Sequence, residues 1–182
     1  YEAVIDNAHE APAYEGRNEH NERISYHTLD GDCRMLTMTR QHLYAAMLAA
    51  AERAGVEFET SSEIIAADPD GALIGANGRE YQGDLVVGAD GVNSKVRTSL
   101  GVATERETFT HGVIRVLVPR GAHDLAETNP DNVINFWAPR LKILYVPCTE
   151  DILYMAMMVA RDDVEATTIP VNKKVWCEEL PF

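Results

Sequence analysis

Residues 84–97 read DLVVGADGVNSKVR, and this segment organises the middle of the chain. Its first part, Leu85 to Ala89, is a short continuous apolar run, which is typical of a strand buried on both faces. A turn at Asp90-Gly91 follows, and Asn93 or Ser94 can then cap a short helix. The segment therefore predicts a buried strand, a tight turn and a capped helix in direct succession.

The junction between such a strand and such a helix suits a phosphorylated ligand. Backbone N–H groups at the start of the helix can bind a phosphate, and Asp90 can accept hydrogen bonds from a ribose or an amide. An Asp-Gly turn by itself is usually an ordinary turn before a capped helix. The complete string is more specific, because Ser94 and Arg97 stand in register with the turn.

Upstream of this segment the sequence predicts a hairpin and then a helix. Residues 24–28 alternate between apolar and polar, the pair Asp30-Gly31 signals a turn, and residues 35–38 continue as an extended segment. The helix is predicted from Arg40 to about Ala54, with apolar residues at helical spacing and flanking cap residues: Leu43, Met47, Ala50 and Ala54 on one face, Thr39 as N-cap and Gly55 after the end. No regular element is predicted for residues 1–22.

Downstream, the sequence predicts mainly strands. A short strand is expected at residues 56–59, followed by a meander at 64–66, 72–74 and 80–81. Longer strands are expected at residues 113–118, 133–137, 143–146 and 152–159, and a terminal helix at about 173–180. The middle of the chain therefore has α/β character and the second half that of an antiparallel sheet, which predicts a mixed α+β and α/β fold.

The charge balance and the cysteine count exclude several classes of protein. The 182 residues include 16 Lys and Arg against 29 Asp and Glu, and the formal net charge of −13 argues against a surface for nucleic acid or an anionic membrane. No stretch approaches the roughly 20 consecutive apolar residues of a membrane span. Cys33, Cys148 and Cys177 form no Cys-x-x-Cys pair, so neither a disulfide scaffold nor a zinc site is predicted, and a reducing cytoplasm fits best.

The common catalytic motifs do not occur in this sequence. No two of the 12 glycines are two positions apart, which excludes both G-x-G-x-x-G and a nucleophile elbow. The six histidines are dispersed, and no pair has the spacing of metal ligands. The sequence therefore names neither a catalytic residue nor a metal site.

The segment 84–97 resembles the Asp-Gly motif of the class A flavoprotein monooxygenases, the p-hydroxybenzoate hydroxylase-like family. A second segment, Arg40-Gln41-His42-Leu43-x4-Leu48, is similar to the Arg-containing helix that precedes this motif in the family. The resemblance implies FAD and NAD(P)H as cofactors. It also implies the residues that bind them, which are Arg40, Asp90, Gly91, Ser94 and Arg97.

The resemblance also implies a domain organisation. Residues 1–32 would be the N-terminal part of a substrate-domain sheet, residues 33–102 a portion of the FAD- and NAD(P)H-binding α/β domain, and residues 103–182 the antiparallel sheet of the substrate domain. Two further signatures of the family, an N-terminal G-x-G-x-x-G and a downstream Gly-Asp segment, do not occur in these residues. The chain is therefore expected to be a central fragment of such an enzyme and to be inactive alone.

The activity that the resemblance implies is hydroxylation of a phenolic or heteroaromatic small molecule with NAD(P)H and O2. In the family the inner face of the substrate-domain sheet forms the aromatic pocket, and the positions that would line it here are His111, Arg115, Trp137 and Tyr145. Each of them has a structural alternative within the sheet core. A homodimer is one possible assembly.

Two other functions stay open. A reductase or halogenase with the same Asp-Gly motif would use the flavin for different chemistry. A cofactor-free binding module would use the sheet as an interaction platform. Colour separates these classes, because a protein that carries FAD is yellow.

Overall fold

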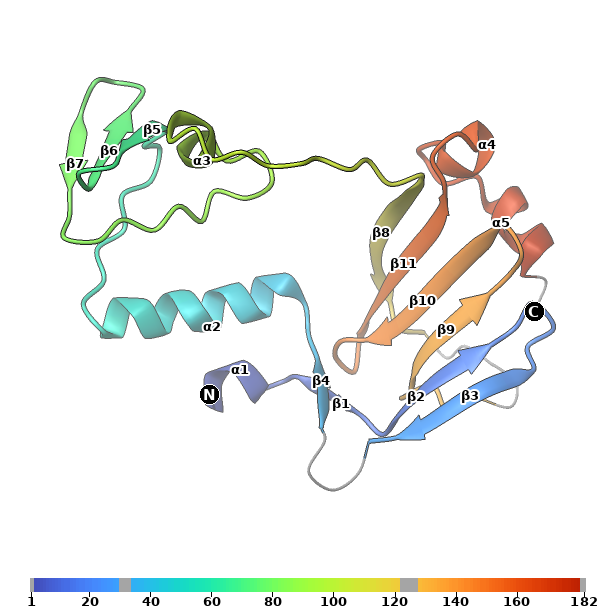
Figure 1. The fold of residues 1–182 in the computed structure, drawn as a ribbon. Helices are drawn as coiled ribbons and strands as arrows, with labels where there is room; N and C mark the ends of the chain where they lie inside the picture. The colour runs from blue at the N-terminus through green and yellow to red at the C-terminus, as the bar shows by residue number, and fades with distance from the viewer. Residues whose placement is uncertain (1, 30–33, 122–127, 181–182) are drawn as a thin grey trace. The chain divides into compact units, whose positions relative to one another are not determined.

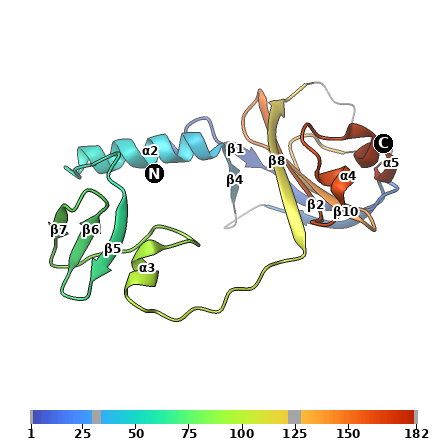
Figure 2. The same cartoon turned by 90° about the horizontal axis from the view of Figure 1, so that it is seen from above.

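The computed structural model describes residues 2–29, 34–121 and 128–180. The chain forms two units, one made of residues 1–54 and 109–182 and the other of residues 55–108, and Figures 1 and 2 show the elements of each. The predicted turn at Asp30-Gly31 lies outside the described residues. The domain boundaries expected after residues 32 and 102 stay predictions.

A six-stranded sheet forms the body of the first unit, with the strand order β3-β2-β9-β10-β11-β8. Neighbouring strands are antiparallel except β2 and β9, which run parallel. The strands predicted in the second half of the chain are confirmed. The bounds are β2 (Ala13–Arg17), β3 (Arg23–Thr28), β8 (His111–Pro119), β9 (Val133–Trp137), β10 (Leu141–Pro147) and β11 (Ile152–Ala160).

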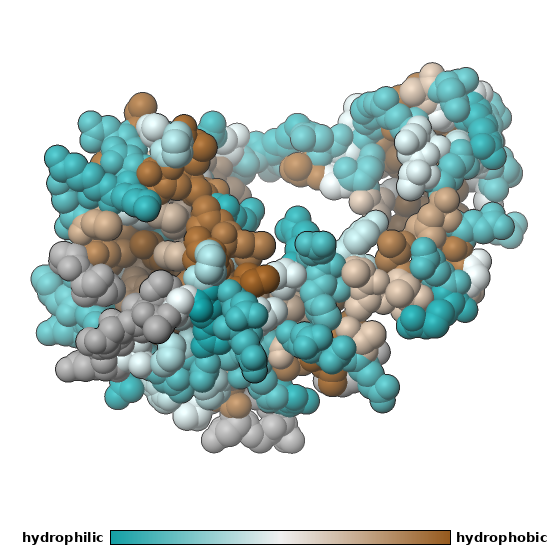
Figure 3. Space-filling view, turned by 180° about the vertical axis from the view of Figure 1, so that it is seen from behind, coloured by the Kyte–Doolittle hydropathy of each residue, from teal (hydrophilic) through white to brown (hydrophobic). Residues whose placement is uncertain are grey.

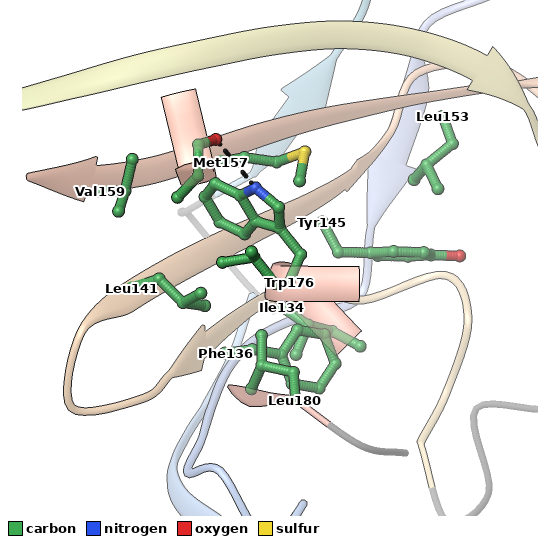
Figure 4. Packing of buried hydrophobic residues seen from close by; sticks show 11 residues of the cluster. Ile134, Phe136, Leu141, Tyr145, Leu153, Met157, Val159, Trp176 and Leu180 are labelled. Carbon is green, nitrogen blue, oxygen red and sulfur yellow. Dashed lines mark hydrogen bonds between the residues drawn. The ribbon is translucent and has the colours of Figure 1, made fainter. Parts of the chain in front are cut away.

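Two helices near the end of the chain pack on one face of this sheet. These are α4 (Val164–Thr167), which the sequence did not predict, and α5 (Lys173–Glu179), which confirms the predicted terminal helix. Trp176 of α5 is 3% exposed and lies among sheet residues such as Ile134 and Met157 (Figure 4). Its Nε1 donates a hydrogen bond of 3.1 Å to the Ala166 carbonyl of α4, so one side chain ties both helices to the core.

The hairpin predicted over residues 24–38 is wrong, because its two strands pair with other partners. β3 pairs with β2, whereas β4 (Met35–Thr37) pairs with β1 (His9–Ala11) in a separate two-stranded ribbon. Both partners, and α1 (Glu2–Ile5), lie in residues 1–22, where no element was expected. β2 was missed because its buried positions include Glu15 and Arg17, an ion pair with Nε 2.7 Å from Oε1, so the strand lacks apolar alternation.

The predicted first helix is confirmed as α2 (Arg40–Arg53). The Thr39 side chain accepts a hydrogen bond from the His42 backbone N–H, and Gly55 has a φ of 78° just beyond the helix end. The predicted apolar face of this helix is exposed, with Leu43 at 38% and Met47 at 60%. Among the described residues, no helix is long and apolar enough to cross a bilayer.

The second unit contains the predicted meander as an antiparallel sheet of β5 (Ile64–Asp68), β6 (Ala72–Gly75) and β7 (Glu80–Gln82). The predicted short helix follows as α3 (Lys95–Ser99). The Ala67 backbone N–H donates to the Ser99 hydroxyl over 2.9 Å, which joins α3 to β5.

The strands predicted at residues 56–59 and 85–89 are wrong for the part of the chain that the structure describes. Neither segment pairs with another strand, and Leu85 and Val87 are 83% and 75% exposed. A strand requires a neighbour that accepts and donates its backbone hydrogen bonds, and an apolar run alone does not supply one. On the face that Figure 3 shows, hydrophobic residues gather in patches among hydrophilic ones.

Candidate functional site

A cavity of about 710 Å³ lies within the first unit. One wall is the connection from β4 into the start of α2, and the other is formed by strands β8, β10 and β11 of the six-stranded sheet. The lining residues are Leu36, Thr37, Met38, Thr39, Arg40, Leu43, Arg115, Leu117, Val146, Cys148 and Tyr154. This volume falls in the range of small-molecule sites.

Two cations predicted from the sequence, Arg40 and Arg115, both line this cavity. Arg40 is the first residue of α2, and Arg115 stands in the middle of β8, opposite Ala156 of β11. No Asp or Glu is among the lining residues of this cavity in the part of the chain that the structure describes. Two guanidinium groups without a carboxylate between apolar walls favour a ligand that carries an anionic oxygen.

Cys148 and Tyr154 also line the cavity and were not predicted. Tyr154 pairs with Val146 across β10 and β11, which brings both onto the cavity side of the sheet. Cys148 is 2% exposed, and burial raises the pKa of its thiol, so the group is a neutral side chain near pH 7. Only the strand register reveals these positions, since neither residue stands in a motif.

The other three residues predicted for the pocket do not line this cavity. His111 begins β8 and is exposed, with its Nδ1 3.1 Å from the Thr110 hydroxyl. Trp137 ends β9 and is 48% exposed, and the Lys142 Nζ lies 3.8 Å from the centre of its ring. Strand alternation and register place both residues on the same face of the sheet as Arg115.

Tyr145 lies on the opposite face of the sheet, within the core against α5 (Figure 4). It is 4% exposed, and its hydroxyl donates to the Pro130 carbonyl over 3.3 Å. Burial raises the pKa of this hydroxyl. Tyr145 borders a smaller apolar cavity of about 260 Å³ between the sheet and α5, together with Trp176.

The Asp-Gly turn in the second unit is held by hydrogen bonds among its own residues. Asp90 Oδ2 accepts from the backbone N–H groups of Lys95 and Val96 over 2.8 and 3.2 Å. The pKa of Asp90 is lowered, first by a hydrogen bond with the Ser94 side chain and then by these backbone donors. The Ser94 hydroxyl in turn accepts from the Arg97 N–H over 2.9 Å, which confirms Ser94 as the predicted helix cap.

Arg97 closes the same turn from the other side. Its Nη2 donates to the Val92 carbonyl over 2.6 Å, and its Nη1 lies 3.4 Å from the Gly91 carbonyl. Gly91 has a φ of 83°, a conformation that L side chains rarely adopt, and a Cβ at Gly88 would stand only 2.8 Å from Val96 Cγ1. The motif residues therefore build the turn, and among the described residues nothing lies within 4 Å of the position that a Cβ of Gly91 would take.

Comparison with known proteins found a family model and several relatives that match this chain. The family model described as an FAD binding domain matches residues 2–181. The chain is 30% identical over 183 residues to a probable 2-heptyl-3-hydroxy-4(1H)-quinolone synthase, AqdB2, of Rhodococcus erythropolis, a match that covers 100% of this chain and 48% of the relative. A 65-residue stretch, 35% of this chain and 15% of the relative, is 46% identical to the FAD-dependent monooxygenase OpS4 of Beauveria bassiana.

A solved structure gives the same result. The tetrameric form of 2-methyl-3-hydroxypyridine-5-carboxylic acid oxygenase matches with a TM-score of 0.91 and 38% identity, over 99% of this chain and 49% of that one. The chain thus spans about half the length of the relatives that it matches. These matches confirm the predicted mixed α/β fold.

Proposed function

The chain belongs to the FAD-binding domain family of class A flavin monooxygenases, and from this premise we propose that the whole protein hydroxylates a small aromatic molecule with NAD(P)H and O2. The observation that carries the proposal is the cavity of the first unit, where Arg40 and Arg115 lie between apolar walls. Bound FAD supplies the activation of oxygen. The side chains of this chain then bind, orient and shield the reactants.

The cavity residues fit the ligands of such a reaction. Arg115 would hold an anionic oxygen of the aromatic substrate, and Arg40 an anionic or polar group of the flavin cofactor. Leu36, Leu117 and Val146 would exclude water from the ring of the substrate. Because Cys148 is neutral when buried, it adds a small apolar surface and no competing charge.

The Asp-Gly turn would serve the cofactors through its backbone and its open face. Gly91 leaves room for close approach, while Asp90, Ser94 and Arg97 keep the turn in shape. We keep these four residues as proposed contacts of FAD or NAD(P)H. His111 and Trp137 would extend the pocket along the sheet face that carries Arg115, and Tyr145 would support that wall from the opposite face.

We further propose that the substrate is a nitrogen heteroaromatic with an ionisable oxygen. The names of two relatives support this class: one is an oxygenase of a hydroxypyridine carboxylic acid and the other a probable synthase of a hydroxyquinolone. Among the described residues the cavity lining includes two arginines and no carboxylate, which agrees with an anionic oxygen on the ring. A homodimer and a cytoplasmic location stay predictions from the sequence.

Cofactor content tests the proposed function directly. The whole protein, purified after expression, should be yellow and release FAD on denaturation. It should consume O2 and NAD(P)H faster when 2-methyl-3-hydroxypyridine-5-carboxylic acid or a 2-alkyl-4-quinolone is added, and mass spectrometry should find a product with one added oxygen. A colourless protein that takes up no FAD would support the binding module. A yellow protein that oxidises NAD(P)H without an oxygenated product would support a reductase, and a halide-dependent product a halogenase.

Replacing Arg115 tests its role in substrate binding. In the whole protein, Arg115→Gln removes the positive charge but keeps hydrogen-bond donors. The Kd of 2-methyl-3-hydroxypyridine-5-carboxylic acid should then rise about 10- to 100-fold, because a charge-assisted hydrogen bond is lost. The matched control is Arg53→Gln, which removes one positive charge from the last turn of α2, away from the cavity lining. Equal Kd values for Arg115→Gln and the unaltered protein, measured by flavin absorbance titration, would remove Arg115 from the substrate site.

A further inference from the structure

One wall of the cavity is attached to the sheet through a very small element. The ribbon of β1 and β4 has three residues in each strand, and β4 continues through Met38 and Thr39 directly into α2, which begins at Arg40. A two-stranded ribbon of this length is not stable on its own. The place of Arg40 therefore depends on how the ribbon is fastened to the six-stranded sheet.

One pair of opposite residues in this ribbon forms hydrogen bonds to the six-stranded sheet or to the residues next to it. His9 and Thr37 stand directly opposite each other in β1 and β4. The Thr37 hydroxyl donates to the carbonyl of Pro147, and His9 Nε2 donates to the carbonyl of Asp131 over 2.8 Å. The two acceptors lie at the end of β10 and just before β9, so the pair is fastened at two separate points of the sheet.

The hydrogen bond of Thr37 occupies its only donor. The hydroxyl oxygen also lies 3.4 Å from the His9 carbonyl, but the Pro147 carbonyl is the nearer acceptor. The hydroxyl proton is therefore committed to the protein and is not free for a ligand. Pro147 stands between Val146 and Cys148, which both line the cavity, so the bond joins the two walls of the cavity.

From this geometry we propose that Thr37 is a positioning residue, whose hydrogen bond to Pro147 sets the separation between Arg40 and Arg115. Thr37 is three residues before Arg40 along the chain, and Arg115 is held independently by its pairing with β11. The inference rests on the proposed function only for the identity of the ligand. Loss of the bond would change neither arginine itself, but it would widen the range of distances between Arg40 and Arg115.

The test uses two substitutions of Thr37 in the whole protein. Thr37→Val removes the hydroxyl with little change in volume, and Thr37→Ser keeps the hydroxyl. For the probe 2-methyl-3-hydroxypyridine-5-carboxylic acid we expect the Kd to rise about five- to tenfold in Thr37→Val and to return to within about twofold in Thr37→Ser. The kcat at saturating probe should change less than the KM, because the chemistry of the flavin is untouched. Thr28→Val, at the exposed end of β3, is the matched control and should bind the probe normally.

A second measurement does not depend on a ligand. Hydrogen exchange of the His42 and Leu43 backbone N–H groups, which are both bonded to Thr39, should be about five- to tenfold faster in the unliganded whole protein with Thr37→Val than in the unaltered protein, and normal with Thr37→Ser. Unchanged exchange in Thr37→Val would overturn the inference, and so would weak binding in Thr37→Val that Thr37→Ser fails to restore. If the unaltered protein binds neither FAD nor the probe while the exchange result holds, the proposed function fails and the positioning role of Thr37 stands.

Discussion

The carboxylate of Asp90 acts within its own turn. It accepts the first N–H groups of α3 and shares a hydrogen bond with the Ser94 side chain, and these donors lower its pKa. A carboxylate whose pKa is lower in the folded state than in the unfolded chain favours folding when it is ionised. This benefit is complete above the ordinary pKa of 3.8 and is lost as the pH falls through the lower pKa of the folded state.

Replacing Asp90 should therefore destabilise the whole protein in a pH-dependent way. We expect Asp90→Ala to lower the Tm at pH 7 and to differ less from the unaltered protein as the pH falls below about 3.8, the ordinary pKa of an Asp side chain. Thermal unfolding followed by circular dichroism at several pH values measures this. Asp84→Ala, at the exposed start of the same segment, is the control. A Tm difference that is the same at every pH would show that the charge of Asp90 does not stabilise the turn.

Single residues differed in how far the sequence could identify them. Thr39 was predicted as a helix cap, and so was either Asn93 or Ser94, because a cap acts on N–H groups two or three residues away; the structure has Ser94 in that role. Arg40 and Arg115 were predicted by resemblance, and the structure brings them to one cavity. Tyr154 was missed, since its contact with that cavity follows from strand pairing and from no local signal.

Among the elements, α5 packs on one face of the six-stranded sheet. Val175 and Trp176 of the helix, together with Leu180 after its end, belong to one core cluster with residues of β9, β10 and β11. Figure 4 shows Trp176 and Leu180 among these strand residues. The indole N–H also satisfies the Ala166 carbonyl within the core. Removing the ring would leave a cavity and an unpaired carbonyl at the same place.

Trp176→Ala should destabilise the protein by about 3–5 kcal/mol. Trp176→Phe keeps an aromatic ring but loses the donor, and we expect it to cost about 1–3 kcal/mol. Urea unfolding monitored by circular dichroism measures both. Ile169→Ala serves as the control, because Ile169 is 71% exposed and should change the free energy of unfolding by less than about 0.5 kcal/mol. Equal midpoints for Trp176→Ala and the control would contradict the role of α5 in the core.

Elements with local signals were predicted well, and elements defined by distant pairing were not. The helix α2 and the meander of β5, β6 and β7 depend on caps and turns within a few residues. β3 and β4 were predicted as strands, but their partners were wrong, because Asp30-Gly31 suggested that they pair with each other. The register of a sheet is a property of both strands, and one strand's sequence does not contain it.

At the scale of the whole molecule, the main difference from the sequence-based prediction is the exposure of apolar side chains that were expected to be buried. The run at residues 85–89 has the composition of a strand buried on both faces, yet Leu85 and Val87 are exposed in the described part of the chain. The relatives that match this chain are about twice as long. Apolar composition predicts that a segment is stable when it is buried, and the described part of the chain leaves Leu85 and Val87 in contact with solvent.

The sequence by itself indicated the family through the resemblance of residues 84–97 to a known motif. It also determined Thr39 as a helix cap, most of the helices and strands, and the Asp-Gly turn, because these follow from short-range spacing and residue chemistry. Only the tertiary structure decided that β2 and β3 join the six-stranded sheet, that Arg40 and Arg115 line one cavity, and that Tyr145 faces the core. The physical reason lies in the long-range hydrogen bonds and buried contacts between residues far apart in the chain. Thr37 and Pro147, 110 positions apart and joined by one hydrogen bond, are an example.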